Sequence, residues 1–143
     1  SVSMISGNEI DALIFPGGTG MAKNIFDYAM KGTNCTVIPD VQKLTIEIID
    51  LGKPIGAICI APVMIAKILQ NLGKNGTLTG GYNQQITKDI QTMGMNIRQV
   101  GAEDIVVDEI NKIVSTPAYV EANSIREVAL GVEKLVKKVV EMI

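Results

Sequence analysis

The stretch Lys53-Pro54-Ile55-Gly56-Ala57-Ile58-Cys59-Ile60-Ala61-Pro62-Val63-Met64-Ile65-Ala66-Lys67 decides the fold of this 143-residue chain. Its first half, residues 54–58, is small or β-branched and has no polar side chain, which is typical of a strand buried on both faces. Its second half is almost wholly apolar as far as residue 69. Pro62 suits the first helical turn, where its missing N–H costs nothing. The stretch therefore predicts a buried strand, a sharp turn at Cys59 and a helix.

Two interpretations of Cys59 are open at this stage. A helix N-terminus has unpaired N–H groups and the positive end of the helix dipole, which favour an anion such as a thiolate. The thiolate is the nucleophilic form of cysteine, and strand–turn–helix is the setting of a nucleophile elbow. Alternatively, Cys59 is a small buried apolar residue, as most free cysteines are.

The composition excludes several kinds of site. The chain has no histidine, so it cannot build a Cys–His or Ser–His–Asp catalytic site on its own. Its two cysteines, Cys35 and Cys59, are too few for an all-thiolate zinc site. They lie far apart without metal-ligand spacing, which fits a reducing compartment better than a disulfide scaffold. We therefore expect no metal and no cofactor.

The net charge and the aromatic content limit the kinds of partner that the chain can bind. The net charge is -2, and there are two Phe, three Tyr and no Trp, which argues against nucleic acid as a main partner. No apolar run approaches the length of a membrane span, so we expect no membrane partner. The length suffices for one domain with a hydrophobic core.

A glycine-rich loop follows a second predicted strand. Residues 10–15 are mostly apolar and end in Pro16-Gly17-Gly18-Thr19-Gly20, where the glycines allow close approach of the backbone. Lys23 stands where the third glycine of a dinucleotide-binding fingerprint would be. The amides of Gly17 and Gly18 therefore suit an oxyanion-binding or close-packing role better than a phosphate loop.

The remaining pattern alternates helices and strands. It predicts helices at residues 22–30, 39–51, 84–93 and 119–142, a brief strand at 77–79, and a hairpin of 105–107 with 112–115. Such alternation indicates an α/β domain with an open, mostly parallel sheet and helices on both faces.

Three loops should meet at the carboxyl edge of this sheet, where such folds place their sites. They are Gly17-Gly18, Cys59-Ile60 and Thr116-Pro117. The alternative is that these are ordinary tight turns, and for Thr116-Pro117 that alternative is favoured. Because the first strand opens directly on the glycine loop, we also expect that an N-terminal β-α-β portion is absent from this chain.

Four segments in register resemble the ThiJ/PfpI superfamily, which is similar to class I glutamine amidotransferases, and look closest to its ElbB branch. They are Asp11–Asn24, Gly52–Pro62, Asp104–Glu109 and Ser115–Tyr119. The resemblance covers nearly the whole chain, as a single domain of residues 1–143, and Cys35 also looks like a family position.

The resemblance implies a flavodoxin-like fold, a homodimer, and Cys59 as the nucleophile of the elbow. It implies glyoxalase-like hydration of small 2-oxoaldehydes, or related carbonyl chemistry, with the oxyanion held by amides of the glycine loop and Ile60. Thr116 and Pro117 would contribute to the pocket. A reducing compartment, cytoplasm or mitochondrial matrix, would suit this chemistry. The branch is linked by name to isoprenoid biosynthesis, which says nothing about the reaction.

The sequence departs from the family pattern in two places. The acidic partner of the cysteine comes from the N-terminal portion in the family, and Glu9 is too close to the first strand to replace it. Ile60 stands where some amidotransferase-like relatives have histidine, so we do not expect glutaminase activity. Two further hypotheses stay open: a non-catalytic redox sensor or interaction protein that uses Cys59, and self-association through an exposed strand edge.

Overall fold

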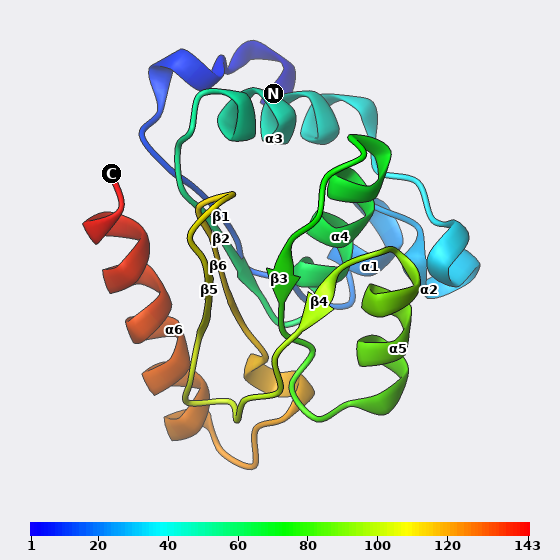
Figure 1. Cartoon of the computed structure of the whole chain (residues 1–143), viewed down its shortest axis with the longest axis vertical. Coiled ribbons are helices and arrows are strands. Elements are labelled where there is room, and N and C mark those ends of the chain that lie inside the picture. Colours follow the sequence, from blue (N-terminus) through cyan, green and yellow to red (C-terminus); the bar gives the residue numbers. More distant parts are fainter.

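Four strands form the main sheet of the computed structural model, which describes residues 1–143 (Figure 1). The central strand β2 (Ile55–Ile58) pairs in parallel with β1 (Leu13–Phe15) and with β6 (Ile113–Thr116). β5 (Val106–Asp108) completes the order β1-β2-β6-β5 by pairing antiparallel with β6. Every residue of β2 is buried, as its apolar sequence predicts. The mostly parallel sheet and the hairpin are both confirmed.

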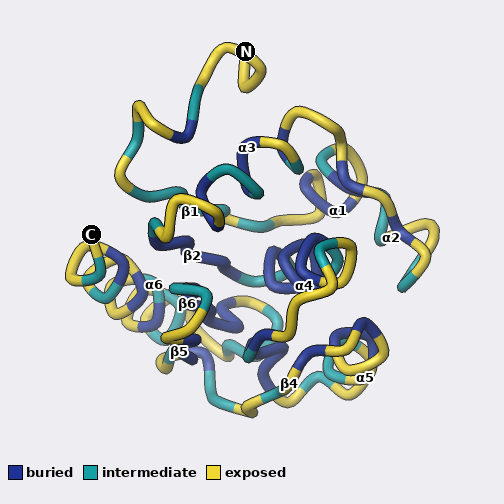
Figure 2. The backbone as a smooth tube through the Cα atoms, turned by 45° about the horizontal axis from the view of Figure 1, so that its top comes forward, coloured by how far each residue is buried: buried dark blue, intermediate teal, exposed yellow.

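Helices cover both faces of this sheet, as predicted for a doubly wound fold of the flavodoxin type. Figure 2 shows α6 (Ile125–Glu141) on one side of the strands and α4 (Ala61–Asn71) on the other. Because successive strand residues point to opposite faces, Ile55 and Ala57 join the larger core cluster, with α4 and α3 (Pro39–Asp50). Ile58 instead packs with residues of α6 in a smaller cluster.

A smaller parallel pair lies beside the main sheet. β3 (Thr77–Leu78) pairs with β4 (Asn96–Ile97), and α5 (Gln84–Thr92) connects them. The strand predicted near residue 77 and the helix predicted at 84–93 are confirmed. β4 was not predicted, because a strand of two residues is too short to show an alternating pattern.

The helix predicted at residues 22–30 is wrong, because the chain forms two short helices there. These are α1 (Met21–Asn24) and α2 (Tyr28–Lys31). Between them Phe26 is almost fully buried and bridges to Val37, and the Asp27 carboxylate accepts a hydrogen bond from Thr36. These contacts with the following segment replace the continuous helix. Short 3₁₀ turns occupy Val2–Met4, Gly7–Glu9, Gly32–Asn34 and Ala118–Val120.

The last helix begins later than the predicted residue 119. α6 starts at Ile125 because the side chain of Ser124 accepts a hydrogen bond from the Glu127 N–H and caps the helix. The buried stripe of α6 is narrow: Leu135 and Val139 are buried, whereas Val136 and Val140 are exposed.

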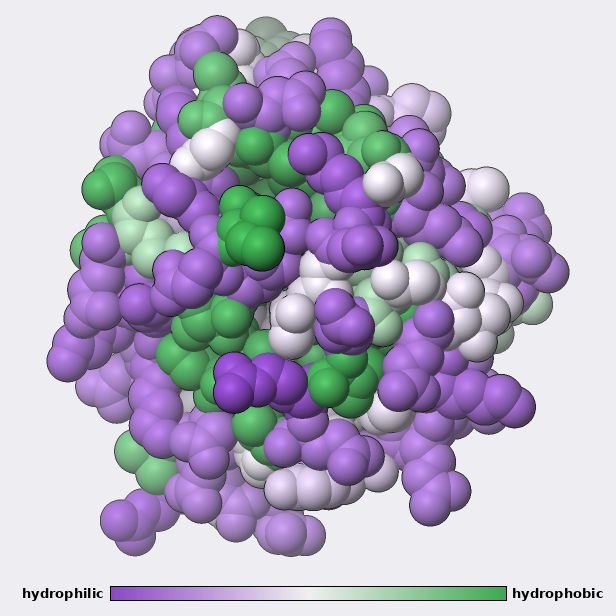
Figure 3. Space-filling model, viewed as in Figure 1, coloured by the Kyte–Doolittle hydropathy of each residue, from purple (hydrophilic) through white to green (hydrophobic).

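None of the helices has both the length and the apolar character that crossing a bilayer requires. Hydrophilic residues dominate the face shown in Figure 3, with hydrophobic side chains in small groups between them.

Gly131 fixes how closely α6 approaches the end of β6. A Cβ atom at this position would overlap the carbonyl oxygen of Ala102 and lie 2.8 Å from the Thr116 hydroxyl. The glycine thus allows contact with the β-strand that carries one of the three site loops.

We expect Gly131→Ala to lower the free energy of unfolding by about 1–2 kcal/mol. Alanine gains roughly 1 kcal/mol of helix propensity, but overlap with a backbone carbonyl oxygen that cannot turn aside costs about 2–3 kcal/mol, the upper part of the range for overpacking. Urea unfolding measures the difference. Gly101→Ala is the control, because nothing lies within 4 Å of its added Cβ. Equal stability of the two variants would contradict the close contact.

Candidate active site

Cys59 adopts a left-handed backbone conformation immediately after β2. Its φ is +63°, which is unfavourable for a residue with a side chain. The strand ladder continues to this residue, since the Cys59 N–H donates to the Thr116 carbonyl at 3.0 Å. α4 then begins at Ala61, with Pro62 in its first turn as predicted. The strand–turn–helix setting of a nucleophile elbow is therefore present, and the Cys59 side chain is only partly buried.

The glycine loop after β1 packs directly against this turn. A Cβ atom on Gly17 would lie 2.5 Å from the Ile58 carbonyl oxygen and 2.9 Å from Cys59 Cβ. Gly17 also has a φ of +84°, so it is required both by conformation and by space. Gly18 has a φ of +98° but nothing within 4 Å of an added Cβ. The loop thus supports the left-handed turn of Cys59 through Gly17.

Three backbone amides beside Cys59 have no acceptor within the chain. The N–H groups of Gly17, Gly18 and Ile60 donate none of the backbone hydrogen bonds outside the regular elements. α4 has no side-chain cap, and within its first turn the Val63 N–H donates to the Ile60 carbonyl at 3.1 Å. These amides belong to the residues expected to bind an oxyanion, and all three residues line one pocket with Cys59.

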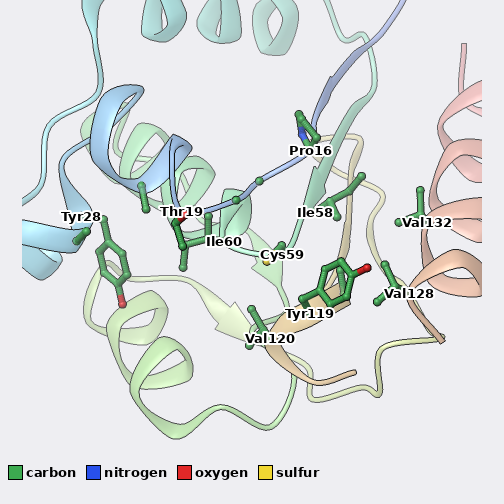
Figure 4. Close-up of a pocket in the computed structure, with 15 residues that line it drawn as sticks. Pro16, Thr19, Tyr28, Ile58, Cys59, Ile60, Tyr119, Val120, Val128 and Val132 are labelled. Atoms are coloured by element: carbon green, nitrogen blue, oxygen red, sulfur yellow. The ribbon is translucent and has the colours of Figure 1, made fainter. Parts of the chain in front are cut away.

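This pocket has a volume of about 720 Å³ and is predominantly apolar (Figure 4). None of the residues that line it carries a charged side chain. They are Pro16, Gly17, Gly18, Thr19, Ala22, Tyr28, Ala29, Ile58, Cys59, Ile60, Ala118, Tyr119, Val120, Val128 and Val132. Two of the three predicted loops, Gly17-Gly18 and Cys59-Ile60, line the pocket together, and the residues that directly follow Thr116-Pro117 complete it.

The third loop contributes differently from expectation. Thr116 and Pro117 are buried, and the pocket is lined by the next three residues, Ala118 to Val120. Thr116 instead makes hydrogen bonds to two neighbouring segments. Its carbonyl accepts from the Cys59 N–H, and its hydroxyl donates to the Asp104 carbonyl at 2.8 Å. Thr116 is therefore a positioning residue for the turn rather than a lining residue.

Tyr28 forms a wall of the pocket that the sequence did not reveal. Its hydroxyl donates to the Asp89 carboxylate of α5, which also accepts from the Gln85 side chain at 2.9 Å. Burial and this hydrogen bond raise the pKa of Tyr28 well above its usual value. The hydroxyl points toward α5 rather than toward Cys59 (Figure 4). Tyr28 therefore remains protonated and shapes the pocket.

α6 supplies a second unforeseen wall through Val128 and Val132. These residues lie four positions apart and so share one face of the helix. Both are partly buried, and only the packing of α6 on the sheet shows that they border the same pocket as Cys59.

Charged side chains and clusters of metal ligands are missing from the site. No Asp, Glu, Lys or Arg is among the lining residues, and no group of three or more potential metal ligands occurs in the structure. Cys35 lies outside this pocket and is fully buried. Burial raises the pKa of the Cys35 thiol, which disfavours its thiolate.

No protein-family model matches the chain. Curated relatives do: it is 35% identical over 147 aligned positions to human "Glutamine amidotransferase-like class 1 domain-containing protein 3, mitochondrial", covering 96% of this chain and 53% of that protein. It is 32% identical over 151 positions to the rat "ES1 protein homolog, mitochondrial", covering 99% of this chain and 55% of that protein. The chain thus spans about half the length of these relatives.

Solved structures agree with the fold. A crystal structure from Ehrlichia chaffeensis, described as an isoprenoid biosynthesis protein with amidotransferase-like domain, superposes with a TM-score of 0.86 at 29% identity. The match covers 99% of this chain and 64% of that one. The 24-kDa rapid encystment protein of Francisella tularensis has a TM-score of 0.68 at 18% identity, which supports the fold alone.

Two glycines of the loop, Gly17 and Gly18, offer a matched pair of substitutions. Gly17→Ala and Gly18→Ala both incur left-handed strain of about 1–2 kcal/mol. Only Gly17→Ala also overlaps the turn, at a further cost of about 1–3 kcal/mol. Urea unfolding should therefore rank Gly17→Ala as the less stable variant. If the two variants lose the same stability, the glycine loop does not support the Cys59 turn.

Asp27 makes the segment that carries Tyr28 sensitive to acid. Hydrogen bonds from Lys31 and from the Thr36 N–H lower the pKa of Asp27 to about 2 from 3.8. A lowered folded-state pKa contributes stability that is present above the unfolded value and is lost as pH falls through the folded value. We expect the urea midpoint of the native chain to fall more between pH 4 and pH 2 than that of Asp27→Asn. The exposed Asp50→Asn is the control and should retain the native pH profile.

Proposed function

Because the chain belongs to the glutamine amidotransferase-like class 1 superfamily that includes ThiJ, we propose that it performs cysteine-dependent chemistry on a carbonyl compound, with Cys59 as the nucleophile. The observation that carries the proposal is the left-handed Cys59 turn in a pocket with three amides that have no acceptor in the chain. The proposed branch is ElbB-like, and the proposed activity is glyoxalase-like hydration of a 2-oxoaldehyde.

The first step is addition of the Cys59 sulfur to the aldehyde carbon. A carbon–sulfur bond forms, the carbonyl π electrons move to oxygen, and that oxygen takes up the proton released by the thiol. The product is a hemithioacetal. The amides of Gly18 and Ile60 are the proposed donors to the developing oxyanion, and loss of one such donor typically costs about 3–4 kcal/mol in the barrier.

The second step needs an acid–base group. A proton must move from the former aldehyde carbon to the neighbouring carbon, and the hemithioacetal hydroxyl proton must move to the neighbouring carbonyl oxygen. The product is a thioester of a 2-hydroxy acid, which water then hydrolyses to free the thiol. No carboxylate lines the pocket, and loss of a proton shuttle typically slows such a step by about 10²–10⁴-fold. The chain of 143 residues should therefore form the adduct and turn it over slowly.

The absence of charged lining residues also argues against glutamine as substrate, because nothing in the pocket pairs with its α-ammonium or α-carboxylate. Relatives from rat, human and zebrafish are named as mitochondrial, which supports a mitochondrial compartment for eukaryotic members. A homodimer remains part of the proposal.

Redox sensing by Cys59 is the alternative function. Cys59 is partly exposed and lines an open pocket, and exposure is one of the properties that make a cysteine susceptible to oxidation. Dilute peroxide should then add two oxygens to Cys59, detected by intact mass and peptide mapping. No adduct on Cys59 would eliminate this alternative.

The enzyme proposal predicts that methylglyoxal protects Cys59 from alkylation. Peptide mapping after a short iodoacetamide pulse should show slower labelling of Cys59 in the presence of the aldehyde. Lactate formation should be slow, and Cys59→Ser should abolish it. Undiminished labelling at saturating aldehyde would refute the nucleophile assignment, and rapid turnover abolished by Cys59→Ser would refute the account of the missing acid.

A further inference from the structure

We infer that the carbonyl compound taken by the Cys59 pocket carries an aliphatic tail, so that glyoxal and methylglyoxal are minimal fragments of its ligand. The inference rests on the proposed function and adds the substrate class. It is drawn from the size of the pocket, its lack of charge and the separation of its polar and apolar parts.

The lining disfavours ligands with charged groups beyond their reacting end. The unpaired amides beside Cys59 can hold one oxyanion, but elsewhere in the pocket a phosphate, carboxylate or ammonium group would lose hydration without gaining a charged partner, since no lining side chain is charged. The polar side chains available are those of Thr19 and Tyr119, because the Tyr28 hydroxyl is engaged by Asp89. Sugars, with a hydroxyl on almost every carbon, would likewise leave most of their polar groups unpaired.

The polar and apolar parts of the pocket are separate. The unpaired amides and the sulfur gather where the β1 and β2 loops meet, at Gly17, Gly18 and Cys59. From Cys59 the pocket extends to Ile58, Val128 and Val132, which lie together on one side of it (Figure 4). A ligand that fits has its carbonyl group at the cysteine and hydrocarbon along α6.

The volume indicates a longer ligand than methylglyoxal. At about 720 Å³, the pocket falls within the range of roughly 300–1,000 Å³ that is usual for sites of drug-sized molecules. A very small, strongly hydrated aldehyde would leave apolar walls in contact with water. Each methylene buried against those walls should strengthen binding by about fourfold.

The test uses a series of unbranched aldehydes, from propanal to octanal, with the matching alcohols. The concentration of each aldehyde that halves the rate of Cys59 alkylation gives an apparent affinity. The alcohols cannot form a hemithioacetal, so their binding, measured by calorimetry on Cys59→Ser, reports the apolar part alone. We expect both series to strengthen with chain length, by up to about 250-fold between the butyl and octyl members, which differ by four methylenes.

Two variants of α6 provide the internal comparison. Val128→Asp places a charge in the pocket and should abolish the chain-length dependence. Val136→Asp places the same charge at an exposed position of the same helix, outside the pocket. This variant should keep the chain-length dependence. Circular dichroism of both variants establishes that they fold.

The outcomes separate the inference from the function on which it rests. If short aldehydes protect Cys59 but neither series gains affinity with length, the aliphatic ligand is overturned and the nucleophile stands. A second outcome is that no aldehyde protects Cys59, whereas the alcohols gain affinity with length and Val128→Asp abolishes that gain. The role of Cys59 as nucleophile is then overturned, and the aliphatic character of the ligand stands. Equal effects of the two Asp variants would overturn the placement of the tail along α6.

Discussion

The left-handed turn at Cys59 is the constraint on which the site depends. A side chain at φ > 0 is strained by about 1–2 kcal/mol, and the surrounding structure must hold it there. β2 holds the turn from one side. This strand is buried on both faces, and its hydrogen-bond ladder continues through the Cys59 N–H to the Thr116 carbonyl. Gly17 holds it from the other side, at a distance that leaves no space for a Cβ atom. The start of α4 leaves the sulfur at the edge of the sheet, facing the pocket.

The two cysteines illustrate how position determines the chemistry of one side chain. Cys35 is enclosed in the main core cluster, where burial raises its pKa and keeps it as the thiol. Cys59 occupies the carboxyl edge of the parallel strands, beside unpaired amides and an open pocket. No carboxylate lines the same pocket, so the proposed carbonyl chemistry would find its nucleophile and its amide donors there but no carboxylic acid to move a proton.

Those parts of the fold that depend on local pattern could be predicted from the sequence. A few adjacent residues are enough to indicate each of these parts. They are the apolar run of β2, Pro62 in the first turn of α4 and the glycines after β1. The breaks near Phe26 and before Ile125 could not be predicted as readily, because they depend on contacts with Thr36 and Val37 and on a cap by Ser124. Tyr28, Val128 and Val132 were missed for a similar reason: their place in the pocket depends on how α2 and α6 dock, which no local pattern records.

The most direct test of the central claim compares the two cysteines in the native chain. A pulse of iodoacetamide followed by peptide mapping gives the alkylation rate of each thiol without any ligand. The account predicts that Cys59 is alkylated in the folded protein, whereas Cys35 reacts only when urea unfolds it. Alkylation of both thiols at equal rates under native conditions, or of Cys35 first, would contradict it.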